Sequence, residues 1–489
     1  MESLHDLEVL IESDHRLIVL ETDREQMFLD GFRRTANRSS KAFFQWTITQ
    51  GLERLAKGYS ALPLFKDINQ LFGQIVAAQQ PGVYVLVDFH HYLEDPTVIR
   101  HLKDVLLKAP QHCLILLSRK VNLPDDLRSH ATPFKLPLPD ATQLKRLIND
   151  LAVEWLSEKS IKLKVADKQM ATRLAASLNG LTISDAERLA RNAIWNDGIL
   201  DDTDIRTIIE HKFELLDPGG LLKLELDFQK LNNIAGLDNL KKWLSVREKV
   251  FSGAVKMPGA DTPKGMLLLG VQGCGKSMAA KAVAGSWKLP LLHFDFGVLY
   301  NRFYGQTEEN LRSALATAEK MQPCVLWIDE IEKGLSATSS SDDLSKRLLG
   351  TFLTWLAEKK SAVFVVATAN NVSELPPELL RKGRFDEVFF VDLPDENLRR
   401  KILDLHLERR DCAQIGINTL AVAQATQGFS GAELEQVVVS ALYEGIANNQ
   451  SLTEDLLLTI ASNTKPLSIL MHEKVSQLQK WAAARTVPA

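Results

Sequence analysis

A glycine-rich loop between an apolar run and a helix-forming run constrains this chain more than any other feature of its sequence. Residues 266–269 read Met-Leu-Leu-Leu, the kind of short apolar run that forms a buried parallel strand. Residues 270–277 read Gly-Val-Gln-Gly-Cys-Gly-Lys-Ser, and the run at 278–284 favours a helix. Glycines let backbone N–H groups turn toward phosphates, and a helix N-terminus adds positive partial charge. This strand, loop and helix therefore predict an α/β fold with a phosphate-binding loop.

The residues of this loop have different expected roles. We expect Lys276 to reach the β- and γ-phosphates of ATP and the Ser277 hydroxyl to bind Mg²⁺. Cys274 lies inside the loop, where its sulfur is either a redox-sensitive brake or a small tolerated side chain. The expected nucleotide-binding residues of the loop are Gly270, Gly273, Cys274, Gly275, Lys276 and Ser277.

Polar residues follow two more apolar runs. Asp329 and Glu330 come directly after the run at 324–328, and the carboxyl end of such a strand is the ligand-binding edge of an α/β sheet. We expect Asp329 to hold Mg²⁺ and Glu330 to polarise the attacking water as general base. The run at 362–367 leads to Asn370, whose amide could orient that water, although asparagine is also common in turns.

Composition narrows the class of protein. The chain has 489 residues, of which 45% are apolar and 25% charged, as in a soluble globular protein. Its net charge of −4 gives no global electrostatic argument for nucleic acid or a membrane surface. The four cysteines form no CxxC pair, and we see no secretory signal and no apolar run long enough to span a bilayer. We therefore expect a cytoplasmic protein from a reducing compartment.

Five further segments add to the nucleotide-binding pattern. They are residues 234–238 (Ile-Ala-Gly-Leu-Asp), 302–308 (Arg-Phe-Tyr-Gly-Gln-Thr-Glu), 379–386 (Leu-Leu-Arg-Lys-Gly-Arg-Phe-Asp), 405–406 (Leu-His) and 426–434 (Thr-Gln-Gly-Phe-Ser-Gly-Ala-Glu-Leu). Together with the loop and the acidic pair, these motifs resemble the AAA+ ATPase family over residues 228–445. The resemblance is closer to the AAA clade of protein-remodelling ATPases.

The resemblance implies contacts with the base of the nucleotide. Ile234, Ala235 and Gly236 would pack on adenine, and His406 would contact the base from the lid. Ala432 would line the sensor-2 position. The cofactors implied are ATP and Mg²⁺.

The resemblance also implies a ring of subunits, with a hexamer as the default. Arg381 and Arg384 would project into the neighbouring subunit's site, where a guanidinium neutralises charge on the γ-phosphoryl group. The other interpretation of this pair is a solvated, charged turn. Phe303, with Tyr304 beside it, would grip substrate in the pore, although one of the two rings could instead pack in the core.

The first half of the chain repeats the order of the second half without its phosphate loop. Five landmarks, including Asp88 with Asp329, recur at offsets of 241 to 255 residues, which favours an internal duplication over an unrelated α/β domain. Residues 21–24 read Glu-Thr-Asp-Arg where the loop should be, and their carboxylates would repel phosphate. Phe89 stands where the general base should be. We therefore predict a degenerate domain that does not bind nucleotide.

These inferences combine into one fold class and one domain plan. We expect a P-loop AAA+ module, with a parallel sheet flanked by helices and a helical lid, preceded by a degenerate AAA-like α/β domain. The expected boundaries are 1–200 for the degenerate domain with its lid, 201–227 for a linker, 228–393 for the ATPase α/β subdomain, 394–460 for the lid and 461–489 for a C-terminal helix.

The overall arrangement is similar to the conserved reading-frame AAA family of cyanobacteria and red-algal plastids. That similarity implies a photosynthetic cell and a cytosolic or stromal location. We expect an ATPase that remodels, unfolds or disassembles an unidentified protein client through a ring pore. The alternative is an ATP-dependent switch or scaffold in photosynthesis or carbon assimilation. A DNA-handling role is disfavoured by the net charge and by the aromatic pore segment.

Overall fold

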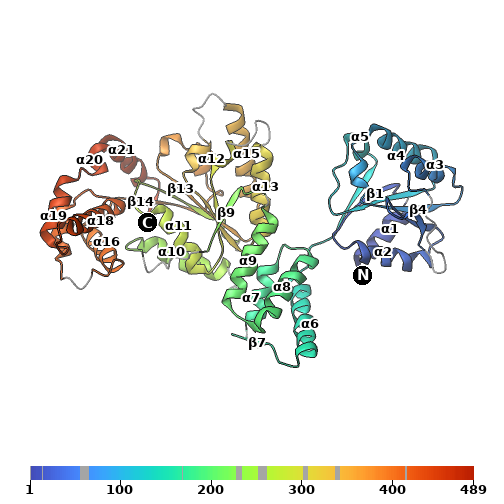
Figure 1. The fold of residues 1–489 in the computed structure, drawn as a ribbon. Coiled ribbons are helices and arrows are strands. Elements are labelled where there is room, and N and C mark those ends of the chain that lie inside the picture. Colours follow the sequence, from blue (N-terminus) through green and yellow to red (C-terminus); the bar gives the residue numbers. More distant parts are fainter. Residues whose placement is uncertain are drawn as a thin grey trace. The chain divides into compact units, whose positions relative to one another are not determined.

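The structure of this chain is a computed structural model, and its described residues form two compact units (Figure 1). The N-terminal unit comprises Met1–Pro139 with Thr182–Asp185, and the C-terminal unit comprises Asp140–Leu181 with Ala186–Ala489. The structure describes residues 2–13, 15–55, 65–167, 169–217, 219–226, 234–251, 262–300, 307–335, 342–412 and 416–489. Among these residues, no helix is both long and apolar enough to cross a membrane.

The N-terminal unit is a six-stranded sheet covered on both faces. Its strands are β1 (Leu17–Glu21), β2 (Ala42–Thr47), β3 (Gly51–Arg54), β4 (Gly82–Val87), β5 (Cys113–Ser118) and β6 (Ala131–Lys135), in the order β3-β2-β4-β5-β1-β6. Its helices are α1 (Glu2–Glu12), α2 (Glu25–Ala36), α3 (Ile68–Ala77), α4 (Pro96–Lys108) and α5 (Asp125–Arg128), with η1 (Phe89–Tyr92) after β4. Among the described strands of this sheet, only the β2–β3 pair is antiparallel.

The alternation of side chains along β1 explains why both faces of this sheet are buried. Leu17 and Val19 join the core beneath α3 and α4, whereas Ile18 and Leu20 join the core beneath α1 and α2. Successive side chains of a strand point to opposite faces, so a continuous apolar run requires a cover on each side.

The C-terminal unit begins with a small helical domain. It consists of α6 (Ala141–Lys159), α7 (Met170–Leu178), α8 (Ile183–Asp197) and α9 (Asp202–Leu216), with the short strand pair β7 (Lys164–Val165) and β8 (Ile199–Leu200). The expected linker at 201–227 therefore holds a full helix, α9, and a strand of the next sheet, β9 (Leu222–Glu225).

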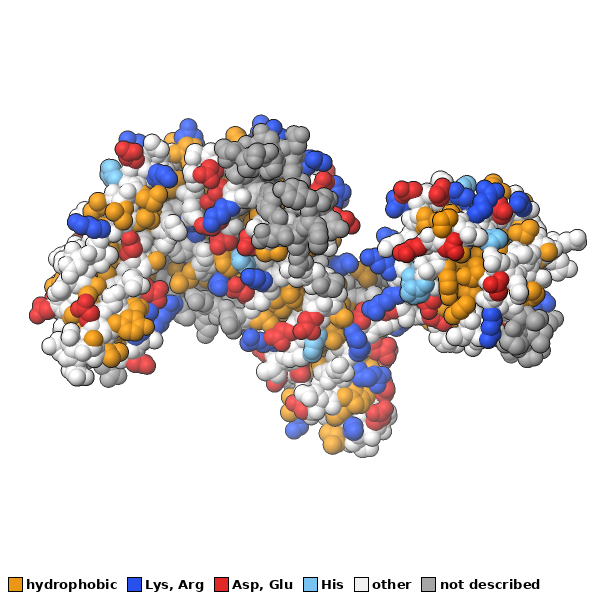
Figure 2. All heavy atoms as spheres, turned by 45° about the horizontal axis from the view of Figure 1, so that its top comes forward, with side chains coloured by type: hydrophobic (Ala, Val, Ile, Leu, Met, Phe, Trp, Pro, Cys, Tyr) orange, Lys and Arg blue, Asp and Glu red, His pale blue; other side chains and the backbone are white. Residues whose placement is uncertain are grey.

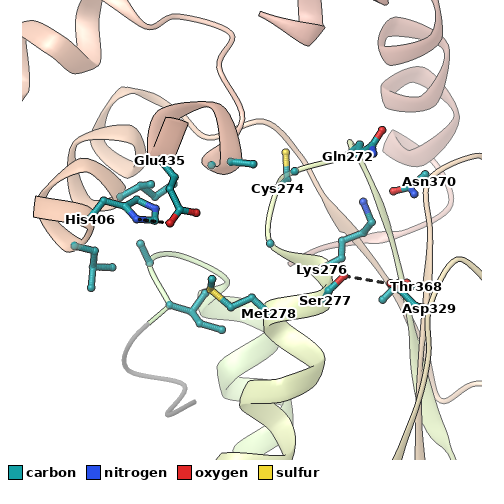
Figure 3. A pocket seen from close by; sticks show the side chains of 18 of the residues that line it. Gln272, Cys274, Lys276, Ser277, Met278, Asp329, Thr368, Asn370, His406 and Glu435 are labelled. Atoms are coloured by element: carbon teal, nitrogen blue, oxygen red, sulfur yellow. Dashed lines mark hydrogen bonds and ion pairs between the residues drawn. The ribbon is translucent and has the colours of Figure 1, made fainter. Parts of the chain in front are cut away.

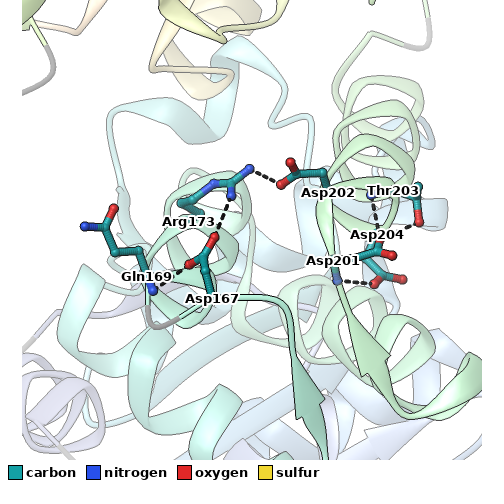
Figure 4. Close-up of polar contacts among 7 residues, drawn as sticks. All are labelled: Asp167, Gln169, Arg173, Asp201, Asp202, Thr203 and Asp204. Atoms are coloured by element: carbon teal, nitrogen blue, oxygen red, sulfur yellow. Dashed lines mark hydrogen bonds and ion pairs between the residues drawn. The ribbon is translucent and has the colours of Figure 1, made fainter.

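Polar side chains define where α9 begins (Figure 4). The Asp201 carboxylate accepts a hydrogen bond from the Thr203 N–H at 2.7 Å, and the Asp204 carboxylate accepts one from the Asp201 N–H at 3.0 Å. Arg173 of α7 bridges Asp167 and Asp202. These caps satisfy donors that a helix N-terminus leaves unpaired, which is why a helix replaces the expected linker.

The second sheet of the C-terminal unit has seven strands. After β9 they are β10 (Gly265–Gly270), β11 (Leu291–Phe294), β12 (Cys324–Ile328), β13 (Val363–Ala369), β14 (Glu387–Val391) and β15 (Val487–Pro488), in the order β15-β14-β10-β13-β12-β11-β9. Helices α10 (Asp238–Phe251) and α11 (Lys276–Trp287) pack on one face, and α12 (Phe296–Tyr300), α13 (Thr307–Lys320), α14 (Ile331–Leu335) and α15 (Asp342–Glu358) lie on the other (Figure 1). Of the strands that the structure describes in this sheet, only β9 is antiparallel to its neighbour.

A helical lid follows the sheet. It consists of α16 (Glu396–Glu408), α17 (Thr419–Ala425), α18 (Gly431–Ala447) and α19 (Glu454–Asn463), which share one apolar core. Beyond it, where one helix was expected, the chain forms α20 (Leu467–Leu470), α21 (His472–Ala483) and β15. Strand β15 pairs with β14, so the end of this segment joins the edge of the second sheet.

The two large sheets share one strand order. Reading β2-β4-β5-β1-β6 in the N-terminal unit gives the same succession as β11-β12-β13-β10-β14 in the C-terminal unit. In each set of five strands, the strand that comes first in the sequence lies between the fourth and the fifth: β1 lies between β5 and β6, and β10 lies between β13 and β14. The prediction of an AAA+ module preceded by an AAA-like α/β domain is confirmed in its fold class.

Candidate active site

A cavity of about 360 Å³ lies where the carboxyl ends of β10, β12 and β13 meet the lid helices α16 and α18 (Figure 3). Most of the residues predicted from the sequence line it. They are Ile234, Ala235, Gly273, Cys274, Gly275, Lys276, Ser277, Asp329, Glu330, Asn370, His406 and Ala432. Parallel strands bring their carboxyl ends to one edge of a sheet, so residues up to about 200 positions apart converge here.

The loop glycines are required for different reasons. Gly273 and Gly275 have φ of 79° and 91°, a left-handed conformation that side chains rarely adopt. A Cβ on Gly270 would lie 2.0 Å from the Val391 carbonyl oxygen, so this glycine permits β10 to approach β14 closely. Gly236 (φ 72°) likewise makes room for Leu398. Gly270 and Gly236, although predicted to bind nucleotide, do not line the cavity.

The Lys276 ammonium lies inside the loop. Its Nζ donates to the carbonyl oxygens of Gly270 and Val271, each at 2.9 Å, and the residue is only 6% exposed. Burial lowers the pKa of Lys276, although nearby acidic groups oppose this shift. The ammonium is thus held by two carbonyls at the position where a phosphate group would offer a stronger, charged acceptor.

Ser277 and Asp329 form an oxygen-rich corner of the cavity. Ser277 Oγ donates to Asp329 Oδ1 at 3.4 Å, and Thr368 Oγ1 donates to the same oxygen at 2.5 Å (Figure 3). A hydroxyl and a carboxylate suit Mg²⁺, which keeps several waters and takes its remaining ligands from substrate phosphates. Among the described residues there is no group of three or more His, Cys, Asp or Glu that could hold a metal. The donor set therefore fits Mg²⁺ held together with a nucleotide.

Thr368 is a site residue that sequence reasoning missed. It is 1% exposed, and its Oγ1 also accepts a hydrogen bond from the Glu330 N–H at 3.0 Å. One hydroxyl therefore ties β13 to both members of the acidic pair. Its position two residues before Asn370, at the end of an apolar run, was the available signal.

The expected general base and the expected water-orienting amide contact each other. Asn370 Nδ2 donates to Glu330 Oε1 at 2.7 Å, and the Lys333 ammonium forms an ion pair with Glu330 Oε2. Glu332 accepts a hydrogen bond from the Asn370 backbone N–H at 2.8 Å and is buried, which raises the pKa of Glu332. Lys333 and Glu332 were not predicted, because their role depends on contacts made by the helix α14.

His406 closes the opposite end of the cavity. Arg410 Nη1 lies 3.3 Å from His406 Nδ1 and Arg410 Nη2 donates to Glu435 Oε1 at 2.8 Å. Glu435 Oε1 lies 3.6 Å from the same nitrogen, so a neutral imidazole can accept from Arg410 or donate to Glu435 through Nδ1. Burial lowers the pKa of His406, which favours the neutral form. The neutral ring lines the cavity together with the apolar side chains of Ile234 and Ala235.

Cys274 lines the cavity with a protonated thiol. Burial raises the pKa of Cys274 to about 12, although Lys276 opposes the shift. A thiol with such a pKa forms little thiolate at neutral pH, and the thiolate is the reactive species. This favours the interpretation of a small tolerated side chain over a redox brake.

The predicted arginine pair and pore residues lie elsewhere. Arg381 is exposed, and Arg384 Nη1 donates to the Leu353 carbonyl oxygen of α15; neither lines the cavity. Both follow the short η4 helix (Pro377–Leu380). Phe303 and Tyr304 lie outside the described residues.

Comparison with known proteins agrees with this division of the chain. Residues 266–393 match the ATPase family associated with various cellular activities (AAA). Residues 3–136 match the N-terminal domain, and residues 142–219 the second domain, of SpoVK-like AAA ATPases.

Similar proteins are found in plastid-bearing algae and in bacteria. The chain is 34% identical to the uncharacterized AAA domain-containing protein ycf46 of Pyropia yezoensis, over 99% of this chain and 98% of that protein. It is 33% identical to the ycf46 protein of Trieres chinensis, over 94% and 88%. It is also 35% identical to the ATP-dependent zinc metalloprotease FtsH of Thermotoga maritima, over 37% of this chain and 30% of that protein.

Proposed function

The chain belongs to the AAA ATPase family and is an ATPase, and from that premise we propose that it uses ATP hydrolysis to remodel a protein client as a ring of subunits. The observation that carries the proposal is the contact of Asn370 Nδ2 with Glu330 Oε1 at 2.7 Å in the cavity that also holds Lys276. A base, an amide and a cation at one end of a cavity are the groups that hydrolysis of a γ-phosphate needs.

The proposed roles follow from the geometry. Lys276 exchanges its two carbonyl partners for the β- and γ-phosphates, and Glu330 takes a proton from a water that the Asn370 amide orients. Ser277 and Asp329 hold Mg²⁺, which when bound neutralises charge on the phosphate oxygens. The base of the nucleotide lies between Ile234, Ala235 and the lid, where the His406 imidazole lines the cavity.

The proposed ring would complete each site with arginines from a neighbour. Support comes from the position of Arg381 and Arg384 outside their own subunit's cavity. The test mixes two inactive variants, Lys276→Ala and the double variant Arg381→Ala, Arg384→Ala. If the arginines act in trans, mixed rings contain some intact sites and regain phosphate release. No recovery on mixing, with both variants shown to assemble together, would contradict the arrangement.

The proposed client is a protein. Over the face drawn in Figure 2, basic and acidic side chains are interspersed, which does not favour a nucleic-acid surface. A Glu330→Gln variant with ATP should retain the client in a pull-down because it traps the nucleotide. Phe303→Ala should then abolish remodelling of the retained client while leaving assembly intact. Remodelling that survives Phe303→Ala would support a scaffold or switch instead.

The kind of cell, the location of the protein and the role of its N-terminal domain are also part of the proposal. The ycf46 relatives come from algae with plastids, which supports a photosynthetic cell and a cytosolic or stromal location.

The N-terminal domain is proposed not to bind nucleotide. In support, a carboxylate lies at the end of β1: Glu21 accepts a hydrogen bond from the Val121 N–H at 3.0 Å. The domain boundaries at 200, 227, 393 and 460 remain predictions.

A further inference from the structure

The lysine that follows the acidic pair contacts the general base in this structure. The two oxygens of Glu330 have different partners: Asn370 Nδ2 donates to Oε1, and the Lys333 ammonium pairs with Oε2. Asn370 comes from the loop after β13 and Lys333 from α14, so the carboxylate is held from two elements.

The surroundings of α14 explain why Lys333 points to Glu330. Ile331 is fully buried, and Glu332 is 3% exposed and holds the Asn370 N–H. Gly334 packs against Phe296 so closely that a Cβ there would lie 2.1 Å from Phe296 Cγ. Three of the first four residues of this helix thus face inward. The Lys333 side chain, 70% exposed, is left on the open side, one turn from the carboxylate.

The base itself cannot easily turn away. Glu330 has a left-handed backbone (φ 47°), and its N–H donates to Thr368 Oγ1 at 3.0 Å. Its carbonyl oxygen accepts the Lys333 N–H at 2.9 Å, which fixes the first turn of α14. Backbone and side chain therefore place Glu330 Oε2 and Lys333 Nζ together before any substrate is bound.

We propose that Lys333 is a positioning residue that restrains Glu330 in the resting site, and that hydrolysis requires the ammonium to release Oε2. With Asn370 on one oxygen and Lys333 on the other, the carboxylate is poorly placed to accept a proton from water. Release of Lys333 frees Glu330 Oε2 to accept the proton, while Asn370 or the incoming water keeps the carboxylate in place. The inference rests on the proposed role of Glu330 as base.

The ion pair between Lys333 and Glu330 should have only a modest effect on kcat. Exposed ion pairs within a helical turn are weak, and salt screens them further. Removal of the ammonium should therefore raise kcat by about two- to fivefold at low ionic strength, where such pairs are strongest. Nucleotide affinity should change little, because Lys333 does not line the cavity.

The test compares three full-length variants with the wild type at saturating ATP and Mg²⁺. Lys333→Met removes the charge, and Lys333→Arg keeps it. Lys360→Met is the matched control, because Lys360 is exposed and lies just before β13, at the opposite edge of the sheet. We expect Lys333→Met to raise kcat with KM changed less than twofold, and the other two variants to match the wild type. The ratio of kcat for Lys333→Met to that of the wild type should fall toward one as salt rises to about 0.5 M.

The result that overturns the proposal is an unchanged or lower kcat for Lys333→Met, or a ratio that does not depend on salt. A lower kcat would mean that the ammonium assists the base. A Glu330→Gln variant that hydrolyses ATP at the wild-type rate would instead contradict the role of Glu330 as base. This measurement separates failure of the proposed function from failure of the inference about Lys333.

Discussion

The two sheets of this protein have the same strand order but different carboxyl edges. In the C-terminal unit, β10 continues into the glycine loop that holds Lys276. In the N-terminal unit, β1 ends at Glu21, whose carboxylate accepts the Val121 N–H. A left-handed residue follows β4 and β12: Asp88 (φ 53°) comes directly after β4, and Glu330 (φ 47°) comes one position later, after Asp329. Both units therefore have a left-handed turn at this edge, but the proposed general base lies only in the C-terminal unit.

The hydroxyl groups near the ends of β5 and β13 also differ in what they contact. Thr368 donates to Asp329 and thereby organises the acidic pair. Ser118, which ends β5, instead donates to the Leu117 carbonyl oxygen and contacts His90 Nδ1 at 2.9 Å. The fold depends on buried apolar alternation, whereas the chemistry depends on a few polar residues at strand ends. The polar residues at the strand ends can therefore differ between two domains that keep the same buried apolar pattern.

The strongest test of this contrast is the number of nucleotide sites. Lys276→Ala removes the cation of the single predicted loop, so nucleotide affinity should fall at least about 100-fold, leaving no high-affinity site in the whole chain. Isothermal titration of wild type and variant with a slowly hydrolysed ATP analogue measures this. High-affinity binding that survives the substitution would mean that the N-terminal unit binds nucleotide after all.

A matched pair of carboxylate substitutions compares the two left-handed turns. Glu330→Gln should lower kcat by about 100-fold or more while ATP still binds, because a general base contributes about 10²–10⁴ in rate. Asp88→Asn changes the carboxylate at the left-handed turn of the N-terminal unit and should leave kcat within about twofold. Steady-state phosphate release gives both values. A large loss with Asp88→Asn would show that the N-terminal edge takes part in turnover.

The two strand-end hydroxyls offer a smaller contrast. Thr368→Val keeps the volume but removes the donor to Asp329, so kcat should fall about tenfold, in line with about 1–3 kcal/mol for an unpaired buried group. Ser118→Ala should leave kcat unchanged and alter only the stability of the N-terminal unit. Equal effects of the two changes on kcat would contradict the asymmetry.

A buried lysine should make the stability of the C-terminal unit depend on pH. Lys212 of α9 is 2% exposed, donates to the Asn179 carbonyl oxygen, and burial lowers its pKa to about 8 from 10.5. The unfolded chain binds more protons above pH 8, so this residue destabilises the fold most below pH 8 and progressively less up to 10.5. No lysine or arginine is among the buried residues described in the N-terminal unit.

Lys212→Met isolates this effect. The variant should be more stable than the wild type at pH 7, and the difference in free energy of unfolding should shrink by about 1 kcal/mol between pH 7 and pH 9. Urea denaturation followed by circular dichroism at both pH values measures it, with Lys360→Met as control for loss of an exposed charge. A difference that stays constant with pH would contradict the buried-lysine account.

Much of the site was predictable because it depends on local patterns. The strand, loop and helix around Lys276 are contiguous in the chain, and Asp329, Glu330 and Asn370 directly follow apolar runs. Thr368 and Glu332 were missed because their contacts, with Asp329 and Asn370, join segments about 40 residues apart. Lys333 was missed because its ion pair with Glu330, three residues away, depends on how the first turn of α14 is oriented. The expected linker at 201–227 was a helix and a strand because caps and a sheet edge stabilise that segment.

The sequence by itself determined that this chain has one phosphate loop and an acidic pair, and it predicted a first half that is related to the second but lacks the phosphate loop. These features follow from residue order, since strand periodicity and glycine conformation are local properties. Only the tertiary structure decided what each polar group contacts in the resting site: Lys276 with two carbonyls, and Glu330 between Asn370 and Lys333. The contact between Glu330 and Asn370 joins residues 40 positions apart, and it depends on how β12 and β13 meet at one edge of the sheet. The contacts of Lys276 and Lys333 are local, but they depend on the conformation of the loop and of the first turn of α14, which the residue pattern does not specify.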